Sequence, residues 1–317
     1  MFKPLGFIGI AAALAMFAGS AYAQTVGIGT TKGGATAQVT AGISKIVSQY
    51  GGGLQMRPQP MGGTQQYIPI VNAGELEFGV ANMMQTYMAF TGTGLSEGAK
   101  ADNLRLVATM MVFRTGIMVR KDSAIKTTAD LKGKRIPYGF DSSPLFLHLM
   151  SGSLANGDVS WDAVQKVPVV ALAPGFNAFK EGKIDGMIAA VGSAPVTELN
   201  ASVSGGVRFI DVLDTPEAVK RALVSAPRTF VAEVKPRPNL VGIDKPTKVF
   251  AFDYMLWANK GVSDDVVYKV TKAMHAHEKE LKALSPLWTS YFPKNMAKDQ
   301  GLPYHPGAIK LYKEAGL

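Results

Sequence analysis

The sequence predicts an α/β fold. Short apolar runs of strand length alternate with amphipathic segments of helical period along most of the chain, a pattern typical of strands and helices packed in layers. Several of the predicted strands end in turns rich in glycine or hydroxyl groups, and each of these turns begins a helix. The length of 317 residues is enough for about two domains, each with a core of its own.

The first part of the chain contains the clearest alternation. Ala37–Gln49 is predicted as a helix because Val39, Ile43, Ile46 and Val47 fall on one face. We expect strands at Thr25–Ile28, Leu54–Pro58, Phe78–Ala81, Leu104–Met111 and Gly116–Val119, and further helices from Gly62 through Asn72 and over Asn82–Thr91.

A second α/β unit follows, beginning with a turn of helix and a strand in Thr127–Ile136. Val234–Pro246, rich in proline and charge, is the best candidate for a linker, and the apolar run Val249–Trp257 follows it. We expect helices at Pro144–Ala155, Gly175–Glu181, Pro216–Leu223 and Asp264–Leu284, and strands at Lys166–Val170, Gly186–Ala190 and Val207–Asp211.

The N-terminus has the features of a secretory signal peptide. Lys3 precedes an apolar run from Leu5 to Ala18, and an A-x-A pattern ends at Ala23. We therefore expect residues 1–23 to be cleaved after Ala23 and the protein to be periplasmic. The alternative, a retained membrane anchor, is disfavoured because the run is shorter than the roughly 18 residues of a membrane span.

Composition narrows the function classes. The absence of cysteine excludes disulfides, thiolate metal sites and cysteine nucleophiles. The formal net charge of +9 favours acidic small molecules or anionic surfaces as partners. Because the basic residues are scattered and not interleaved with aromatic residues, we expect no nucleic-acid binding.

Four turns that follow predicted strands could bind a ligand: Gly29–Ala35, Gly62–Thr64, Asn82–Gln85 and Gly139–Ser143. Glycine allows a ligand to approach the main chain, and the free N–H groups at a helix N-terminus attract anions. Any one turn also fits an ordinary connection, but several together suggest a crevice at the carboxyl ends of the strands. A nucleotide is not expected, since Lys32 precedes the glycine pair and the P-loop order is absent.

No set of catalytic or metal-binding residues is evident. His148, His275, His277 and His305 lack metal-ligand spacing with one another or with a carboxylate, and a structural role is expected for each. The surroundings of Ser193 do not form a G-x-S-x-G elbow. We therefore expect neither an enzyme nor a cofactor nor a metal.

Two basic residues are candidates for neutralising a bound acid. Arg114 follows the apolar run Val107–Phe113 and would reach the rim of a crevice, where a guanidinium pairs with a carboxylate in a bidentate way. Lys32 lies within the first glycine-rich turn. A solvated loop position is the alternative for both.

These residues, taken in order, resemble the TAXI family, the solute-binding subunits of TRAP transporters. The resemblance covers nearly all of Gln24–Leu317 and is most specific at the P-x-H-P-G-A ending, Pro303–Ala308. The other matching segments are Ile28–Thr36, Gly62–Thr64, Gly74–Gly79, Asp130–Arg135 and Glu181–Gly186.

The resemblance implies a type II periplasmic-binding-protein fold, with two α/β lobes joined by two hinge crossovers around a ligand cleft. The first lobe would comprise residues 24–128 and 246–317, and the second residues 129–245. His305 would belong to a structural motif. The implied function is capture of a small organic acid by hinged closure and delivery to a TRAP permease with fused small and large components, by a monomeric protein.

The departures from the family pattern bear on the ligand. Where many members carry Q-S-D, this chain has Asn82, Met83 and Met84, so the acid that could hold an ammonium group is replaced by methionine. We therefore expect a carboxylate without an amino group, either a dicarboxylate or an aromatic acid. The predicted ligand-binding residues are Thr30, Thr31, Lys32, Gly33, Gly63, Thr64, Asn82, Met83, Met84, Arg114, Ser142, Ser143, Phe176 and Ser193. The alternatives are a binding protein for an ABC permease or a membrane sensor, and an enzyme on the same scaffold.

Overall fold

The computed structural model describes residues 24–317, so the predicted signal peptide lies outside the described residues. The chain forms one mixed sheet in the order β2-β1-β3-β10-β4-β7, in which β8 also pairs with β4 and β9 with β10, and a second sheet of β5 and β6. The strands are β1 (Gln24–Thr31), β2 (Leu54–Met61), β3 (Phe78–Asn82), β4 (Leu104–Arg120), β5 (Arg135–Gly139), β6 (Gln165–Val169), β7 (Gly186–Ala190), β8 (Val207–Phe209), β9 (Phe230–Val234) and β10 (Thr247–Asn259). The α-helices are α1 (Gly34–Tyr50), α2 (Thr64–Ala73), α3 (Met83–Thr91), α4 (Leu145–Asn156), α5 (Leu172–Lys180), α6 (Ala194–Ser202), α7 (Pro216–Ser225), α8 (Asp264–Ala276), α9 (Glu278–Leu284) and α10 (Pro306–Ala315).

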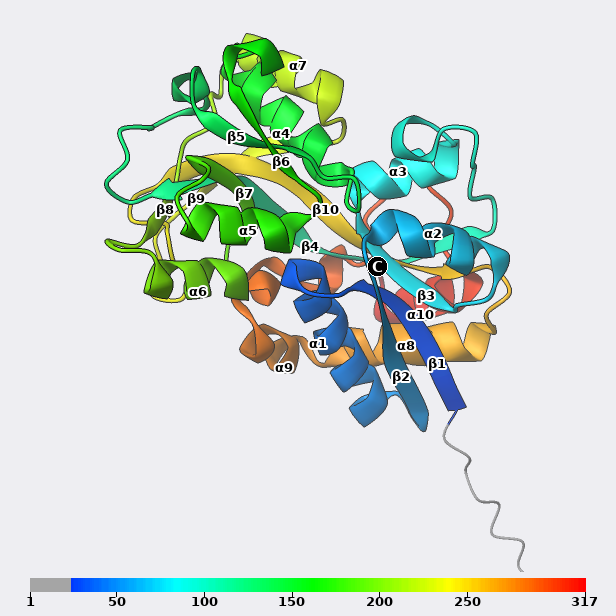
Figure 1. The fold of residues 1–317 in the computed structure, drawn as a ribbon. Helices are drawn as coiled ribbons and strands as arrows, with labels where there is room; N and C mark the ends of the chain where they lie inside the picture. The colour runs from blue at the N-terminus through cyan, green and yellow to red at the C-terminus, as the bar shows by residue number, and fades with distance from the viewer. Residues whose placement is uncertain (1–23) are drawn as a thin grey trace, which may run out of the picture.

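Two long antiparallel strands connect the halves of the molecule. β4 and β10 pair from Thr115 opposite Phe250 to Leu104 opposite Asn259. Their paired ends at Leu104 and Asn259 belong to the half that holds β1–β3, and their other ends pair with β7, β8 and β9. Figure 1 shows them running between the blue and cyan strands β1–β3 and the green elements β5–β7 and α4–α6.

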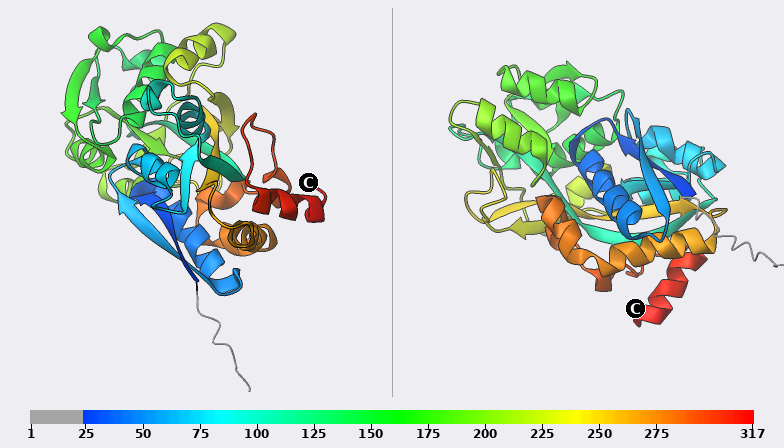
Figure 2. Two further views of the ribbon diagram at one scale, coloured as in Figure 1. Left: turned by 90° about the vertical axis from the view of Figure 1, so that its right-hand side faces the viewer. Right: turned by 90° about the horizontal axis from the view of Figure 1, so that it is seen from below.

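In the first half, helices cover both faces of the sheet. α1 packs on β1 and β2 and contacts α8, while α2 and α3 pack on β3 and β10 against a separate hydrophobic cluster around Tyr67 and Trp257. Both of those side chains are fully buried. α10, the last helix, lies against α8 on the outer side of this half (Figure 2).

In the second half, α4 packs against α7, and α5 and α6 pack against β7. The sequence analysis did not predict β9 or α6. β9 pairs with the first residues of β10, which places it at the sheet edge next to the predicted linker. Its exposed Phe230 and Glu233 give it little of the apolar pattern of a buried strand.

Two predictions were wrong: one strand was divided in two, and two helices were joined into one. β4 is a single strand where two were expected, and Arg114 lies in its middle and not on a loop. The helix predicted over Asp264–Leu284 ends at Ala276, because His277 leaves the helical conformation with φ −120° and ψ 46°. The His277 ring stacks on Tyr50 of α1 with centroids 3.6 Å apart, which places α9 against the first half.

Within residues 24–317, no helix is long and apolar enough to cross a bilayer.

Candidate functional site

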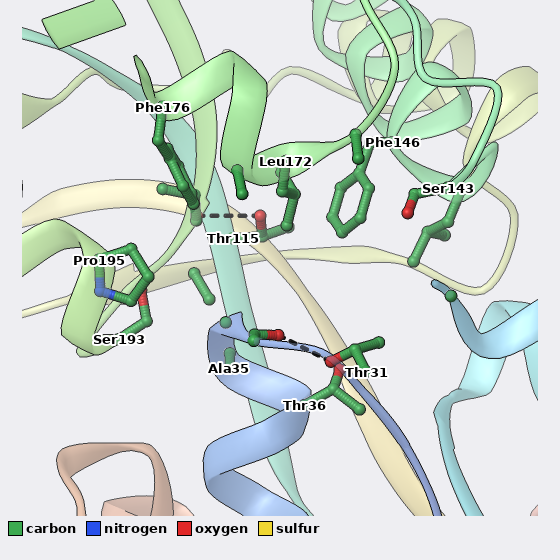
Figure 3. A pocket seen from close by; sticks show the side chains of 18 of the residues that line it. Thr31, Ala35, Thr36, Thr115, Ser143, Phe146, Leu172, Phe176, Ser193 and Pro195 are labelled. Atoms are coloured by element: carbon green, nitrogen blue, oxygen red, sulfur yellow. Dashed lines mark hydrogen bonds between the residues drawn. The ribbon is translucent and has the colours of Figure 1, made fainter. Parts of the chain in front are cut away.

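A cavity of about 620 Å³ lies between the two halves of the molecule. It is lined by the turns after β1, β2 and β3, by the starts of α4, α5 and α6, and by the long strands β4 and β10. Figure 3 shows Thr31, Ala35 and Thr36 on one side of it and Phe146, Leu172 and Phe176 on the other. The volume falls within the range of about 300–1,000 Å³ that is typical of small-molecule sites.

Several helices begin at the wall of this cavity without a side-chain cap. The N-cap residues of α1, α2, α4, α5 and α6 are Gly33, Gly63, Pro144, Ala171 and Ser193, and all of them line the cavity. None of these N-caps accepts a side-chain hydrogen bond from its helix. The first-turn N–H groups of a helix have no intrahelical acceptor, so an uncapped end is a binding position for negative charge.

Helices that begin away from the cavity are capped differently. α7, α8 and α10 start at Thr215, Ser263 and His305, and each of these side chains accepts a hydrogen bond from a main-chain N–H. α3, whose N-cap Asn82 lines the cavity, is also capped, because the Asn82 amide oxygen accepts from Gln85 N at 2.8 Å. The missing caps are therefore concentrated at the cavity, although the short helix α9 also lacks one.

The first glycine-rich turn folds so that the start of α1 is open to the cavity. Gly34 has φ +79°, a left-handed conformation that disfavours residues with a side chain. Gly33 before it is extended, and a Cβ at either glycine would meet no atom within 4 Å. Ala35 and Thr36, the next residues of α1, line the cavity.

Three of the six hydroxyl groups expected to bind the ligand already have a hydrogen-bond partner elsewhere. Thr31 Oγ1 donates to the Gly33 carbonyl at 2.7 Å, and Ser143 Oγ donates to the Gly62 carbonyl at 3.1 Å. Thr30 Oγ1 lies 2.5 Å from Thr40 Oγ1 inside the core. An anion would therefore rely on main-chain N–H groups more than on these hydroxyls.

Tyr254 and Thr36 form a pair that retains a free proton. The Tyr254 hydroxyl lies 2.7 Å from Thr36 Oγ1, and both residues line the cavity. Only one of the two hydroxyl protons serves the bond between them, so the other can be donated to a ligand. Burial raises the pKa of Tyr254, so the phenol stays neutral and brings no negative charge to the site.

Aromatic rings from β4 and β10 form the back wall. Phe113 stacks on Phe252 with centroids 5.7 Å apart and on Tyr254 with centroids 4.9 Å apart. Thr115, next on the same face of β4, donates to the Ala189 carbonyl at 3.0 Å. These rings lie on the strands that join the two halves, so the wall spans the connection between them.

The charged residues of the lining are few. Lys32 lies at the first turn, and Lys180 and Glu198 lie on α5 and α6. All three side chains belong to exposed residues, so they lie at the rim and not in the interior of the cavity.

The structure brings most of the predicted site residues together. Those that line the cavity are Thr31, Lys32, Gly33, Gly63, Thr64, Asn82, Ser142, Ser143, Phe176 and Ser193. Thr30, Met83, Met84 and Arg114 are not part of the lining. Met83 and Met84 are buried in the two hydrophobic clusters on either side of the sheet.

Arg114 faces away from the cavity because of the strand pleat. Successive side chains of a strand point to opposite faces, and Phe113 and Thr115 on either side of Arg114 both line the cavity. Burial, together with the neighbouring Arg237, lowers the pKa of Arg114.

The back wall and the apolar side chains of α4 and α5 were not predicted from the sequence. The signal for the wall was present in Val249–Trp257, where Phe250, Phe252 and Tyr254 alternate with smaller residues in a period of two. That period places one face of the strand on the cavity. The sequence shows this strand as apolar, and its apolar pattern alone does not indicate that one side lines a cavity.

Comparison with solved structures gives the fold. The periplasmic binding protein BugD is 15% identical, with a TM-score of 0.58, and the match covers 92% of this chain and 98% of that one. MatC from Rhodopseudomonas palustris with bound malate is 17% identical, with a TM-score of 0.54 over 82% of this chain and 87% of that one. The alkanesulfonate-binding protein SsuA from Xanthomonas axonopodis pv. citri, bound to MOPS, is 15% identical, with a TM-score of 0.50 over 93% of this chain and 91% of that one.

These likenesses confirm the α/β fold of a periplasmic binding protein with two lobes. A model of the NMT1-like family matches residues 28–316, nearly the whole described chain. The narrower resemblance to TAXI subunits stays a prediction. By the extent of the family match, the chain belongs to the NMT1-like family.

Proposed function

We propose that the protein is an exported, periplasmic solute-binding protein that captures a small organic acid between its lobes and delivers it to a membrane permease. The lobes would comprise residues 24–128 with 246–317 and residues 129–245. Two contacts support a closing motion of the lobes about β4 and β10: Ser143 Oγ donates to the Gly62 carbonyl, and the Arg228 guanidinium lies 4.1 Å from the centroid of the Tyr87 ring.

The observation that carries the proposal is the set of uncapped helix N-termini at the cavity. Each supplies main-chain N–H groups and the positive end of a helix dipole, which favour an anion such as a carboxylate. Lys32 adds positive charge beside α1, and the Thr36–Tyr254 pair adds a neutral donor. The acid head would therefore bind between the starts of α1 and α2.

The same side of the cavity supports an acid without an amino group. The lining residues that precede Phe113 in the chain include no Asp or Glu. An ammonium group next to the bound carboxylate would have no counter-charge there and would be repelled by Lys32. Glu198, the acid of the lining, lies at the rim on α6.

Removing one main-chain N–H tests this site directly. Ala35 is the first residue of α1 after the left-handed Gly34, where proline is tolerated because its missing N–H has no helical acceptor. We expect Ala35→Pro to weaken carboxylate binding at least about tenfold, since a hydrogen bond to a charged group contributes about 1.5–3 kcal/mol. Isothermal titration of purified protein with a panel of carboxylic acids measures this.

Ala35→Gly is the matched control, because it changes the same side chain and keeps the N–H. Its affinity should stay close to that of the wild type, and both variants should keep the wild-type melting temperature within a few degrees. An equal loss of affinity in both variants would show that the Ala35 main-chain N–H does not bind the carboxylate. Failure of every acid to bind the wild-type protein would overturn the proposal as a whole.

For the partner, we propose a TRAP permease of the TAXI type, on the strength of the motifs at Ile28–Thr36 and Pro303–Ala308. Uptake of a labelled ligand by cells should then stop when ion gradients are collapsed while ATP is maintained. Uptake that persists under these conditions and stops on ATP depletion would assign the protein to an ABC permease instead.

A further inference from the structure

The two sides of the cavity differ in chemistry. Thr31, Thr36 and the glycines of the first two turns make one side polar. The opposite side carries the large apolar side chains of the lining outside the strands, Leu145, Phe146 and Leu149 from α4 and Leu172 and Phe176 from α5, with polar residues such as Ser143 and Asn177 beside them. Figure 3 shows Phe146, Leu172 and Phe176 on one side of the cavity, opposite Thr31 and Thr36.

The back wall continues the apolar side. Phe113 on β4 stacks on both Phe252 and Tyr254 of β10, and all three line the cavity. Flat rings held by two paired strands form a rigid surface on which another flat or branched hydrocarbon group can pack. The polar side, the wall and the apolar side therefore surround a ligand with a polar end and an apolar body.

The apolar side has no net charge from its side chains. Lys180 and Glu198 lie at its rim as one cation and one anion, both on exposed residues. Arg114, the residue expected to hold a carboxylate, lies on the other face of β4. A second carboxylate reaching this side would find the uncapped starts of α4, α5 and α6, but no lysine or arginine of the lining apart from Lys180 at the rim.

Resting on the proposed function, we propose that the ligand is an amphiphilic monoanion with one acid group and an aromatic or branched hydrocarbon body. The acid group binds at the starts of α1 and α2, and the body packs between the Phe113–Phe252–Tyr254 wall and the side chains of α4 and α5. A four-carbon dicarboxylate has no hydrocarbon body with which to cover the apolar side chains of α4 and α5 and the rings of the wall.

A series of acids separates this inference from the function it rests on. Isothermal titration of the purified protein is carried out with phenylacetate, acetate, succinate and the uncharged phenylacetamide. We expect phenylacetate to bind at least about 100-fold more tightly than acetate or succinate, because a single methylene in an apolar pocket already changes affinity by about 10-fold or more. Phenylacetamide should bind at least about tenfold more weakly than phenylacetate, because it lacks the charge.

The outcomes are distinct. If acetate or succinate binds as tightly as phenylacetate, the amphiphile inference is overturned while acid capture stands. If no acid binds and phenylacetamide does, or if nothing binds, the proposed acid capture fails together with the inference.

Two variants locate the hydrocarbon body. Phe146→Ala and Phe176→Ala should each weaken phenylacetate binding about tenfold and leave the much weaker binding of acetate unchanged, because acetate does not reach these rings. Phe230→Ala is the control: Phe230 is 42% exposed on β9 and outside the lining, so its loss should change neither affinity. Equal weakening of both acids by Phe146→Ala and Phe176→Ala would show that these rings do not contact the body of the ligand.

Discussion

At the scale of single residues, two glycines of the first ligand-facing segment have different physical roles. A Cβ at Gly29 in β1 would lie 2.6 Å from ring atoms of Tyr67. Tyr67 cannot move easily, since it is fully buried and its hydroxyl donates to the Val80 carbonyl at 2.7 Å. Gly33, four residues later, has extended backbone and an open Cβ position. The sequence shows two similar glycines, and only the packing separates them.

We predict that Gly29→Ala destabilises the protein by about 1–3 kcal/mol, because it overpacks the contact with Tyr67. Gly33→Ala should change stability by less than about 0.5 kcal/mol, as expected for a substitution into open space. The measurement is the midpoint of urea unfolding at constant slope. Equal midpoints for the two variants would show that the β1–α2 contact is not tightly packed.

At the scale of elements, the direction of the β4 side chains was not predictable from the local sequence. The residues around Arg114 read equally well as two strands with a loop or as one strand, and the loop reading placed Arg114 at the cleft. Pairing with β10 keeps the strand continuous through Arg114 opposite Ala251. The pleat then turns Arg114 away from the cavity and turns Phe113 and Thr115 toward it.

The contact between Arg228 and Tyr87 should slow release of the ligand. Arg228, between α7 and β9, has φ +63° and lies over the ring of Tyr87 on α3. We predict that Arg228→Asn speeds ligand dissociation about two- to five-fold, because a cation–π contact of about 0.5–1 kcal/mol holds the closed form. Asparagine is chosen since it tolerates the left-handed conformation. Stopped-flow displacement of bound ligand gives the rate.

Lys282→Met is the control for this prediction, because Lys282 makes a similar contact of 3.9 Å with Phe292 away from the cavity lining. It should leave the dissociation rate unchanged. Tyr87→Leu should raise the rate as Arg228→Asn does, and the double variant should show no further increase. Additive effects in the double variant would mean that the two side chains do not act as a pair.

At the scale of the whole molecule, the C-terminal helix is tied to the first lobe by a buried histidine. His305 is fully buried, its Nδ1 accepts from Gly307 N at 3.2 Å, and the same atom lies 3.6 Å from Asp264 of α8. Burial lowers the pKa of His305 below its ordinary value of 6.5, although Asp264 and the carbonyls of Val262 and Lys260 oppose this shift and Arg105 adds to it. The folded protein therefore favours the neutral ring.

This depressed pKa predicts a loss of stability in mild acid. Below pH 6.5 the unfolded chain binds a proton that the folded chain binds only at lower pH, so the free energy of unfolding falls as the pH drops from about 7 to 5. His305→Asn keeps an acceptor for capping α10 but does not titrate, so its unfolding free energy should depend less on pH in this range. Urea unfolding at several pH values tests this, and parallel curves for the two proteins would contradict it.

The sequence by itself determined the α/β class, most helices and strands, and the turns that meet at the cavity. Local periodicity and the low helical propensity of glycine show within a segment where a strand ends and a helix begins. The turns that contain Gly33, Gly63 and Ser143 could therefore be predicted from the sequence. Only the tertiary structure decided which side chains face the cavity. The direction in which a side chain points depends on strand pairing and on contacts between distant segments. The pairing of β10 with β4 forms the Phe113–Phe252–Tyr254 wall. Packing in the two hydrophobic clusters keeps Met83 and Met84 out of the cavity. These choices are made by long-range burial, which no single segment of sequence specifies.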